Sequence, residues 1–321
     1  MNTEGETVYG IRSWNTWNRD HPDDLTPSRT RVWDVHKENP FPVTAYDELV
    51  RIVSFLHVMN KVDVLLFRGQ QGRSPLVPTL LRDTWTPPPR SGIGEVPIAR
   101  HRDHYWKKLD KVSAKVFQML HDDKSLLPRW HPFSLFKTKP LAAWAVVQHY
   151  ELWPTPLLDL TSSLRVAASF ALGLKNDSEK RARSTENVSS PSRQRSGYLY
   201  VLRFDSVVSN LMTLDEGKPA DLQAIRLNSV CPPDARRPHY QEGFLLARTR
   251  SFDQAHQLNS TESASSRLVA KFKLIDDGRF WTPDFPPHST ASLLPTESDD
   301  ELQREFGRLK YRLERDVVLV D

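Results

Sequence analysis

The stretch Val62-Asp63-Val64-Leu65-Leu66-Phe67-Arg68-Gly69-Gln70 decides the expected fold of this 321-residue chain. Its compact apolar run predicts a buried strand, and the strand delivers Arg68 at its end. A charged side chain at the end of an apolar strand is costly to bury unless it meets a partner or a ligand. The stretch therefore predicts both a core strand and a candidate binding residue.

The elements expected outward from this strand differ between the two halves of the chain. Apolar periodicity predicts helices over 45–59, 98–121, 140–150 and 163–174, and Thr44 is the expected N-cap of the first. A short strand is expected over 30–35, longer strands over 197–204, 222–228, 241–248 and 267–275, then a helix over 297–314 and a last strand over 317–320. Helices concentrated in the N-terminal half and strands in the second predict an α+β fold.

The prolines bear on the domain organisation, because the chain has 24 Pro and only 12 Gly. Several lie in the connections, but Pro154 and Pro156 hold extended the segment that leads to Asp159 and Thr161. We therefore expect an N-terminal extension over 1–44 and a single domain over 45–321. Polar stretches at about 175–196 and 255–266 are expected to be flexible loops.

Composition excludes several classes of protein. The net charge of +4 is too mild to indicate a nucleic-acid binder by itself. The single cysteine, Cys231, excludes an intramolecular disulfide framework and a Cys-rich zinc site, and His101 and His104 lack an acidic partner at ligand spacing. We expect no metal. No apolar run reaches the about 18 residues of a membrane helix and no signal peptide is evident, so we expect a cytoplasmic protein without a membrane partner.

Polar residues at the ends of apolar segments have structural as well as functional interpretations. Arg68 either binds a ligand or pairs with Asp159. His149, at a helix C-terminus, is either functional or a histidine whose charge the helix dipole favours. Thr161 and Ser162 are expected N-cap residues of the next helix. Gln241 and Glu242 are expected on a strand, where neighbouring side chains alternate between faces, so one should face inward and the other solvent.

Taken together, three ordered motifs resemble the FRG-domain family. The first is Phe67-Arg68-Gly69. The second is Gln148-His149-Tyr150 followed by the run over 154–161 and an Ala-rich helix. The third is Arg237 followed by Gln241, Gly243 and Phe244. The resemblance covers roughly 45–275. The chain departs from the family at Pro156, which stands in place of an arginine, and at Leu160, which stands in place of a tryptophan.

A weaker resemblance to ADP-ribosyltransferases concerns the order of three elements. They are Arg68, then Thr161-Ser162-Ser163, then Gln241-Glu242. This resemblance implies a split sheet of the ADP-ribosyltransferase type and NAD as substrate. Arginine suits a bidentate grip on a diphosphate, and a carboxylate near the anomeric carbon stabilises an oxocarbenium-like transition state. Gly243 stands where the second acidic residue of a Glu-x-Glu pair would fall.

The expected function is NAD cleavage with ADP-ribosyl transfer or hydrolysis, which would suit a toxin or a defence effector. We expect a cleft that holds a nucleotide-like small molecule, with a protein or nucleic acid as acceptor. The expected catalytic residues are Gln241, Glu242, His149 and Asp159. The expected cofactor-binding residues are Arg68, Gln70, Tyr150, Thr161 and Ser162. The alternative is a non-enzymatic FRG binding module that recognises protein or nucleic acid.

Overall fold

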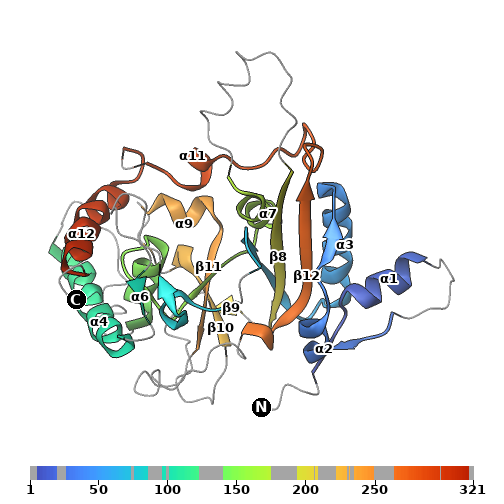
Figure 1. Cartoon of the computed structure of the whole chain (residues 1–321), viewed down its shortest axis with the longest axis horizontal. Helices are drawn as coiled ribbons and strands as arrows, with labels where there is room; N and C mark the ends of the chain where they lie inside the picture. The colour runs from blue at the N-terminus through green and yellow to red at the C-terminus, as the bar shows by residue number, and fades with distance from the viewer. Residues whose placement is uncertain are drawn as a thin grey trace. The chain divides into compact units, whose positions relative to one another are not determined.

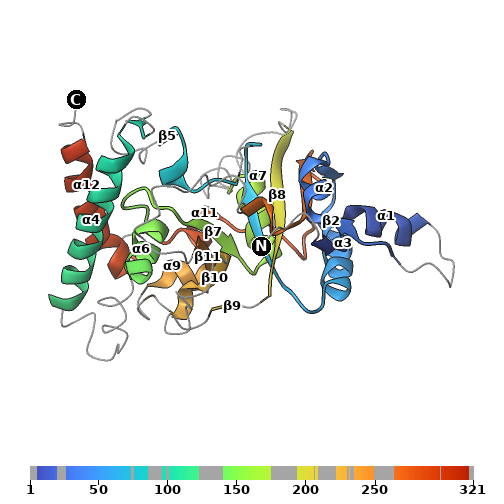
Figure 2. The same ribbon diagram turned by 90° about the horizontal axis from the view of Figure 1, so that it is seen from below.

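The chain folds into two compact units, which are best described one at a time. Unit 1 comprises Met1–Pro75, Leu160–Ser206 and Thr261–Leu293, and unit 2 comprises Leu76–Asp159, Val207–Ser260 and Leu294–Asp321. The computed structural model describes residues 6–19, 27–73, 76–85, 96–98, 101–122, 140–174, 194–205, 207–208, 222–229, 231, 235–248, 264–296 and 298–317. Figures 1 and 2 give two views of the ribbon.

Unit 1 is built on a mixed sheet. Three long strands form its centre: β4 (Val64–Gln70), β8 (Arg195–Phe204) and β12 (Leu268–Asp276). β8 pairs antiparallel with both β4 and β12. Next to them, β3 (Phe41–Val43) runs parallel to β12, and the end of β7 (Leu158–Thr161) pairs antiparallel with β4. Apolar residues of the central strands are almost fully buried, which makes this sheet the core of the unit.

Helix α7 (Leu164–Leu172) lies directly on this sheet. A Cβ on Gly69 of β4 would lie 1.7 Å from the carbonyl oxygen of Ala167, and one on Gly197 of β8 would lie 1.8 Å from that of Ala171. The helix is rich in alanine on this face, so backbone packs against backbone. The glycine of the Phe-Arg-Gly motif is thus required by packing. Both views show α7 beside β8.

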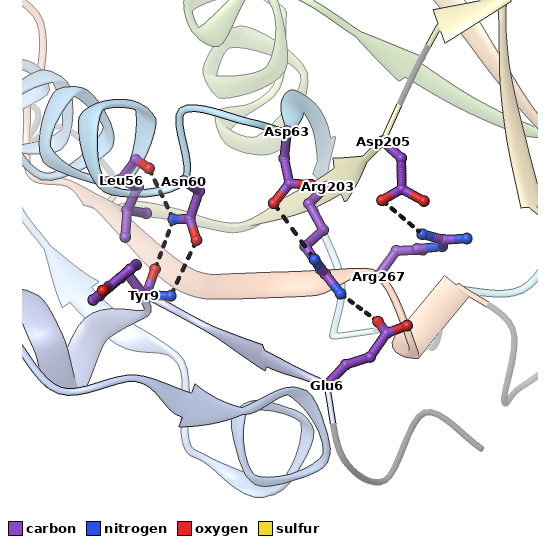
Figure 3. A network of polar contacts seen from close by, with 8 residues as sticks. All are labelled: Glu6, Tyr9, Leu56, Asn60, Asp63, Arg203, Asp205 and Arg267. Atoms are coloured by element: carbon purple, nitrogen blue, oxygen red, sulfur yellow. Dashed lines mark hydrogen bonds and ion pairs between the residues drawn. The ribbon is translucent and has the colours of Figure 1, made fainter. Parts of the chain in front are cut away.

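The N-terminal segment is tied to the rest of unit 1 by polar contacts (Figure 3). The Asn60 side chain exchanges two hydrogen bonds with the backbone of Tyr9, at 3.1 and 3.0 Å, and also donates to the carbonyl of Leu56 at 2.8 Å. The Arg203 guanidinium contacts both Glu6 and Asp63. The domain boundary expected between residues 44 and 45 stays a prediction.

The remaining elements of unit 1 are short, apart from one helix. They are β1 (Thr7–Val8), α1 (Ile11–Arg19), β2 (Thr30–Arg31), α2 (Val32–Lys37), α3 (Tyr46–Met59) and α11 (Thr290–Leu293). Helix α3 buries an apolar stripe that includes Leu49, Ile52 and Leu56.

Unit 2 packs helices around a second apolar core. Its longer helices are α4 (Arg102–Asp122), α6 (Pro140–His149) and α12 (Glu301–Val317), and α4 lies beside α12 in both views. Its strands β10 (Leu222–Arg226) and β11 (Gly243–Arg248) pair antiparallel, and β9 (Val207–Val208) runs parallel to β10. The shorter elements are η2 (Thr79–Leu81), β5 (Thr84–Trp85), β6 (Val96–Pro97), η5 (Leu227–Ser229) and α9 (Arg236–Tyr240).

Aromatic rings fill much of the core of unit 2. Tyr105 stacks on Trp153 with 5.3 Å between ring centroids, and Trp106 meets Trp144 at 5.6 Å. The indole nitrogen of Trp153 donates to the carbonyl oxygen of Tyr105 at 3.1 Å, so this buried donor is satisfied. Trp153 is therefore a core residue.

The mixed α and β content confirms the expected fold class, and most long elements lie where the sequence predicts them. Four details are wrong. Residues 32–37 form helix α2, so the strand expected over 30–35 covers only Thr30 and Arg31. The N-cap of α3 is Ala45, without a side-chain bond, and not Thr44. Val317 ends helix α12 and does not begin a strand.

The fourth error concerns residues 236–242. The sequence predicts that Gln241 and Glu242 begin a strand, but residues 236–240 form helix α9, and both residues lie in the turn before β11. The last strand expected over 318–320 lies outside the described residues, as do most of the loops expected at 175–196 and 255–266. None of the helices in the described part of the chain combines the length and apolar character that crossing a membrane requires.

Candidate functional site

Unit 1 brings Arg68 next to the Thr-Ser-Ser segment. Phe67 of β4 pairs directly with Thr161 of β7, so the residue after Phe67 lies beside the end of β7. Arg68 is half-buried, and its Nε donates to Oε1 of Gln70 at 3.3 Å. Four predicted residues, Arg68, Gln70, Thr161 and Ser162, therefore share one region of unit 1.

The Thr-Ser-Ser segment forms the turn from β7 into α7. The Thr161 hydroxyl accepts a hydrogen bond from the backbone N–H of Ser163 at 3.0 Å, and Ser163 Oγ accepts one from Val166 N–H at 3.4 Å. Ser163 is therefore the N-cap of α7, and the prediction that Thr161 and Ser162 cap the helix is wrong. Thr161 is buried, whereas Ser162 is exposed at the tip of the turn.

In unit 2, His149 is the last residue of α6 and is buried, with 3% of its surface exposed. Burial, and then the nearby charge of Arg237, lower the pKa of His149 to about 3, against the opposing effects of a hydrogen bond to the Arg237 backbone and the charge of Glu151. The expectation of a histidine charged by the helix dipole is therefore wrong. Among the described residues, His149 Nε2 has no hydrogen-bond partner.

Next to His149, Tyr150 belongs to a buried network centred on Asp300. The Tyr150 hydroxyl donates to Asp300 Oδ2 at 3.0 Å, and the backbone N–H groups of Arg236 and Arg237 donate to the same oxygen at 3.1 and 3.3 Å. Asp300 Oδ1 accepts from the N–H of Gln303, in the first turn of α12. Burial and the Asp300 charge raise the pKa of Tyr150, which stays protonated.

Glu151 and Arg237 connect the end of α6 to α9. Arg237 Nη2 lies 2.7 Å from Glu151 Oε1, and Lys310 lies 3.8 Å from the other carboxylate oxygen. Although burial opposes the shift, Arg237 and Lys310 lower the pKa of Glu151 to about 2. Glu151 has a left-handed backbone with φ of 54°, a conformation that non-glycine residues rarely adopt.

Asp159 is fixed by a chain of side-chain contacts in unit 2. Gln148 Nε2 donates to Asp159 Oδ2 at 2.7 Å, and Gln148 Oε1 accepts from the hydroxyl of Thr155. The Asp159 charge raises the pKa of Arg82, although burial lowers it by more. The Gln-His-Tyr motif thus includes a glutamine that orients the aspartate of the following segment. An Arg68–Asp159 pair stays a prediction, since the two residues belong to different units.

Gln241 and Glu242 form a strained turn between α9 and β11. Gln241 is the C-cap of α9 and is half-buried, and Glu242 is exposed with φ of 45°. The next residue, Gly243, is buried: a Cβ there would lie 2.7 Å from Leu227 Cδ1 and 3.6 Å from His149 Cε1. Left-handed non-glycine residues often occur at functional sites. His149 thus packs behind the Gln241–Glu242 turn.

The predicted site residues fall into two groups, one in each unit, and their convergence on a single cleft stays a prediction. The sequence gives no signal for a role of Glu151, Arg82 or Asp300, and it marks Arg237 only as part of a motif. Asp300 has no local signal, because it lies in a charged segment far along the chain from its partners. The described residues contain no group of three or more His, Cys, Asp or Glu that could hold a metal ion.

Comparison with known protein families shows that residues 63–180 match the model of the FRG domain. The matched region begins just before the Phe67-Arg68-Gly69 motif and includes the Gln148-His149-Tyr150 motif, β7 and α7. No curated protein and no solved structure matches the chain.

Proposed function

We propose that the FRG domain of this chain binds NAD and cleaves its nicotinamide–ribose bond. The observation that carries the proposal is the pairing of Phe67 with Thr161, which brings Arg68 beside the Thr161-Ser162-Ser163 turn. Thr161 shares the sheet face of Phe67, and Arg68 lies on the opposite face. Ser162, exposed at the tip of the turn, is therefore the hydroxyl that could hold the ribose while Arg68 holds the diphosphate.

In the proposed reaction the C–N glycosidic bond breaks and nicotinamide leaves with the bonding electrons. An acceptor nucleophile or water then adds to C1′ of the ribose and releases a proton. A carboxylate stabilises the oxocarbenium-like transition state. The weaker resemblance assigns this role to the Gln241-Glu242 pair, in which Glu242 supplies the carboxylate. Asp159 is a further candidate carboxylate. His149, which is neutral and buried, acts as a positioning residue behind the Gln241–Glu242 turn.

A second candidate function, ligand binding without cleavage, is favoured by the packing at Gly243. The weaker resemblance implies a second acidic residue of a Glu-x-Glu pair at position 243, but a side chain there would collide with Leu227. The turn therefore offers one acidic residue, Glu242. An FRG module that binds a nucleotide, a protein or a nucleic acid needs no second carboxylate.

Incubation of the purified chain with NAD distinguishes the two functions. We expect nicotinamide release, measured by chromatography, to fall at least tenfold in Arg68→Lys, because lysine cannot make the bidentate contact. Glu242→Gln should stop release and leave NAD binding, measured by calorimetry, unchanged. The exposed Arg308→Ala, far along α12, is the matched control. Binding without release favours the binding module. If the protein shows neither NAD binding nor nicotinamide release, both proposed uses of NAD are contradicted.

A further inference from the structure

The face of the unit 1 sheet that carries Arg68 also carries other polar and cationic side chains. The strand register places Arg68 of β4 opposite Tyr200 of β8, and Tyr200 opposite Lys271 of β12. The next row on the same face contains Gln70, Tyr198 and Lys273. Gly69 and Gly197 alternate with these residues and meet the backbone of α7. The two rows therefore lie on the face of the central strands opposite α7.

Arg73, just after β4, adds a further charge to the first row. Burial lowers the pKa of Lys271, and the positive charge of Arg73 lowers it further. Burial raises the pKa of Tyr200, and the positive charges of Arg73 and Arg68 and a hydrogen bond with Gln70 oppose this shift. We refer to Arg68, Arg73, Tyr200 and Lys271 as the cationic cluster.

Glu38, the carboxylate that acts on Lys271, is shared with another cation. Glu38 raises the pKa of Lys271, but it is itself ion-paired with Arg12, with 2.6 Å between Oε1 and Nε. Lys271 Nζ donates one hydrogen bond, to the carbonyl oxygen of His36 at 2.7 Å, and an ammonium group has three donors. Arg73 is exposed. The cluster thus brings like charges together, and Lys271 and the exposed Arg73 keep donors that an anion could accept.

We propose that the cationic cluster binds the diphosphate of a nucleotide, and so extends the anion grip of Arg68 across three strands. The proposal rests on the proposed function and names its phosphate subsite. Neighbouring strands lie about 4.8 Å apart, so the backbones of Arg68 and Lys271, two strands apart, are separated by about 10 Å. Long side chains reaching inward from these positions suit an anion with several oxygens better than a single carboxylate. Tyr200 supplies a hydroxyl between the two cations.

Calorimetry with inorganic pyrophosphate, ADP-ribose and nicotinamide riboside tests the subsite. We expect pyrophosphate and ADP-ribose to bind, with affinity falling as salt is raised, and the phosphate-free riboside to bind at least tenfold more weakly. Arg73→Ala and Lys271→Gln should each weaken pyrophosphate binding at least fivefold. Lys61→Ala, an exposed lysine of the same unit, should bind as the wild type does. Arg73→Ala changes an exposed residue, so its melting temperature should not change.

The outcomes separate the subsite from the proposed function. Pyrophosphate binding that depends on Arg73 and Lys271, in a protein that releases no nicotinamide, supports the subsite and contradicts NAD cleavage. Nicotinamide release that is unaffected in both variants, or wild-type affinity for pyrophosphate in both, overturns the subsite. It is also overturned if a single-stranded oligonucleotide binds through these residues while pyrophosphate and ADP-ribose do not.

Discussion

Gly69 lies so close to the backbone of Ala167 that a Cβ on it would be 1.7 Å from the Ala167 carbonyl oxygen. The obstacle is backbone, and it is held in a helix whose first turn is capped by Ser163. No side-chain movement can relieve such a contact. The Phe-Arg-Gly motif therefore combines a core residue, a candidate ligand-binding residue and a glycine that lets α7 rest on the sheet.

Gly69→Ala should destabilise the protein severely, by about 3 kcal/mol or more, because the helix must move away from the sheet. Thermal unfolding followed by circular dichroism would measure the loss. Ala167→Gly should not rescue the variant, since the clash is with the carbonyl group and not with the alanine methyl. Recovery of the wild-type melting temperature in the double variant would contradict this packing.

Gly243→Ala should behave differently, because its close neighbour is the end of a side chain. The added methyl would meet Leu227 Cδ1 at 2.7 Å, and Leu227 can be shortened. We expect a loss of about 1–2 kcal/mol from overpacking. In a double-mutant cycle with Leu227→Val, the combined loss should be smaller than the sum of the two single losses. Strict additivity would show that the two positions do not touch.

The sequence predicts the strand at 62–67, the helix at 45–59 and the strand at 197–204 because each has a clear apolar pattern with matching end signals. Helix α9 is not predicted, because Pro238 lies within its five residues and the apolar residues around it show no helical spacing. Helix α2 escapes because Val32 and Val35, three apart, also fit a short strand. Short elements depend on tertiary packing more than on local pattern.

For the candidate site, the sequence identifies residues at the ends of apolar segments but not their partners. Gln148 and Asp159 are 11 residues apart, and the sequence does not show how the chain turns at Trp153 to bring their side chains together. The Asp300 network spans 150 residues to Tyr150, a separation at which local spacing carries no signal. The net charge of +4 likewise gives no sign of the cationic cluster, whose residues come from β4, β8 and β12 and from Arg73 just after β4.

Asp300→Asn should destabilise the protein by about 3 kcal/mol, because one oxygen of this fully buried side chain accepts three hydrogen bonds. An amide group in its place also weakens the cap on the first turn of α12. Tyr150→Phe removes a single donor and should cost about 1 kcal/mol. The exposed neighbour Asp299→Asn serves as the control. Equal losses in Asp300→Asn and Asp299→Asn, measured by urea unfolding, would contradict the network.

His149 should make stability fall as the pH is lowered from about 6.5. The folded protein holds the pKa of His149 at about 3, whereas in the unfolded chain the imidazole titrates near its ordinary 6.5. Between these values the unfolded state binds a proton that the folded state does not, so stability decreases toward acid, by up to about 1.4 kcal/mol per pH unit. Urea unfolding at pH 7, 6 and 5 measures the slope. His149→Asn should be less stable at pH 7 but should lose most of the slope, whereas His101→Asn, an exposed histidine, should keep it. An unchanged slope in His149→Asn would mean that another group governs the acid sensitivity.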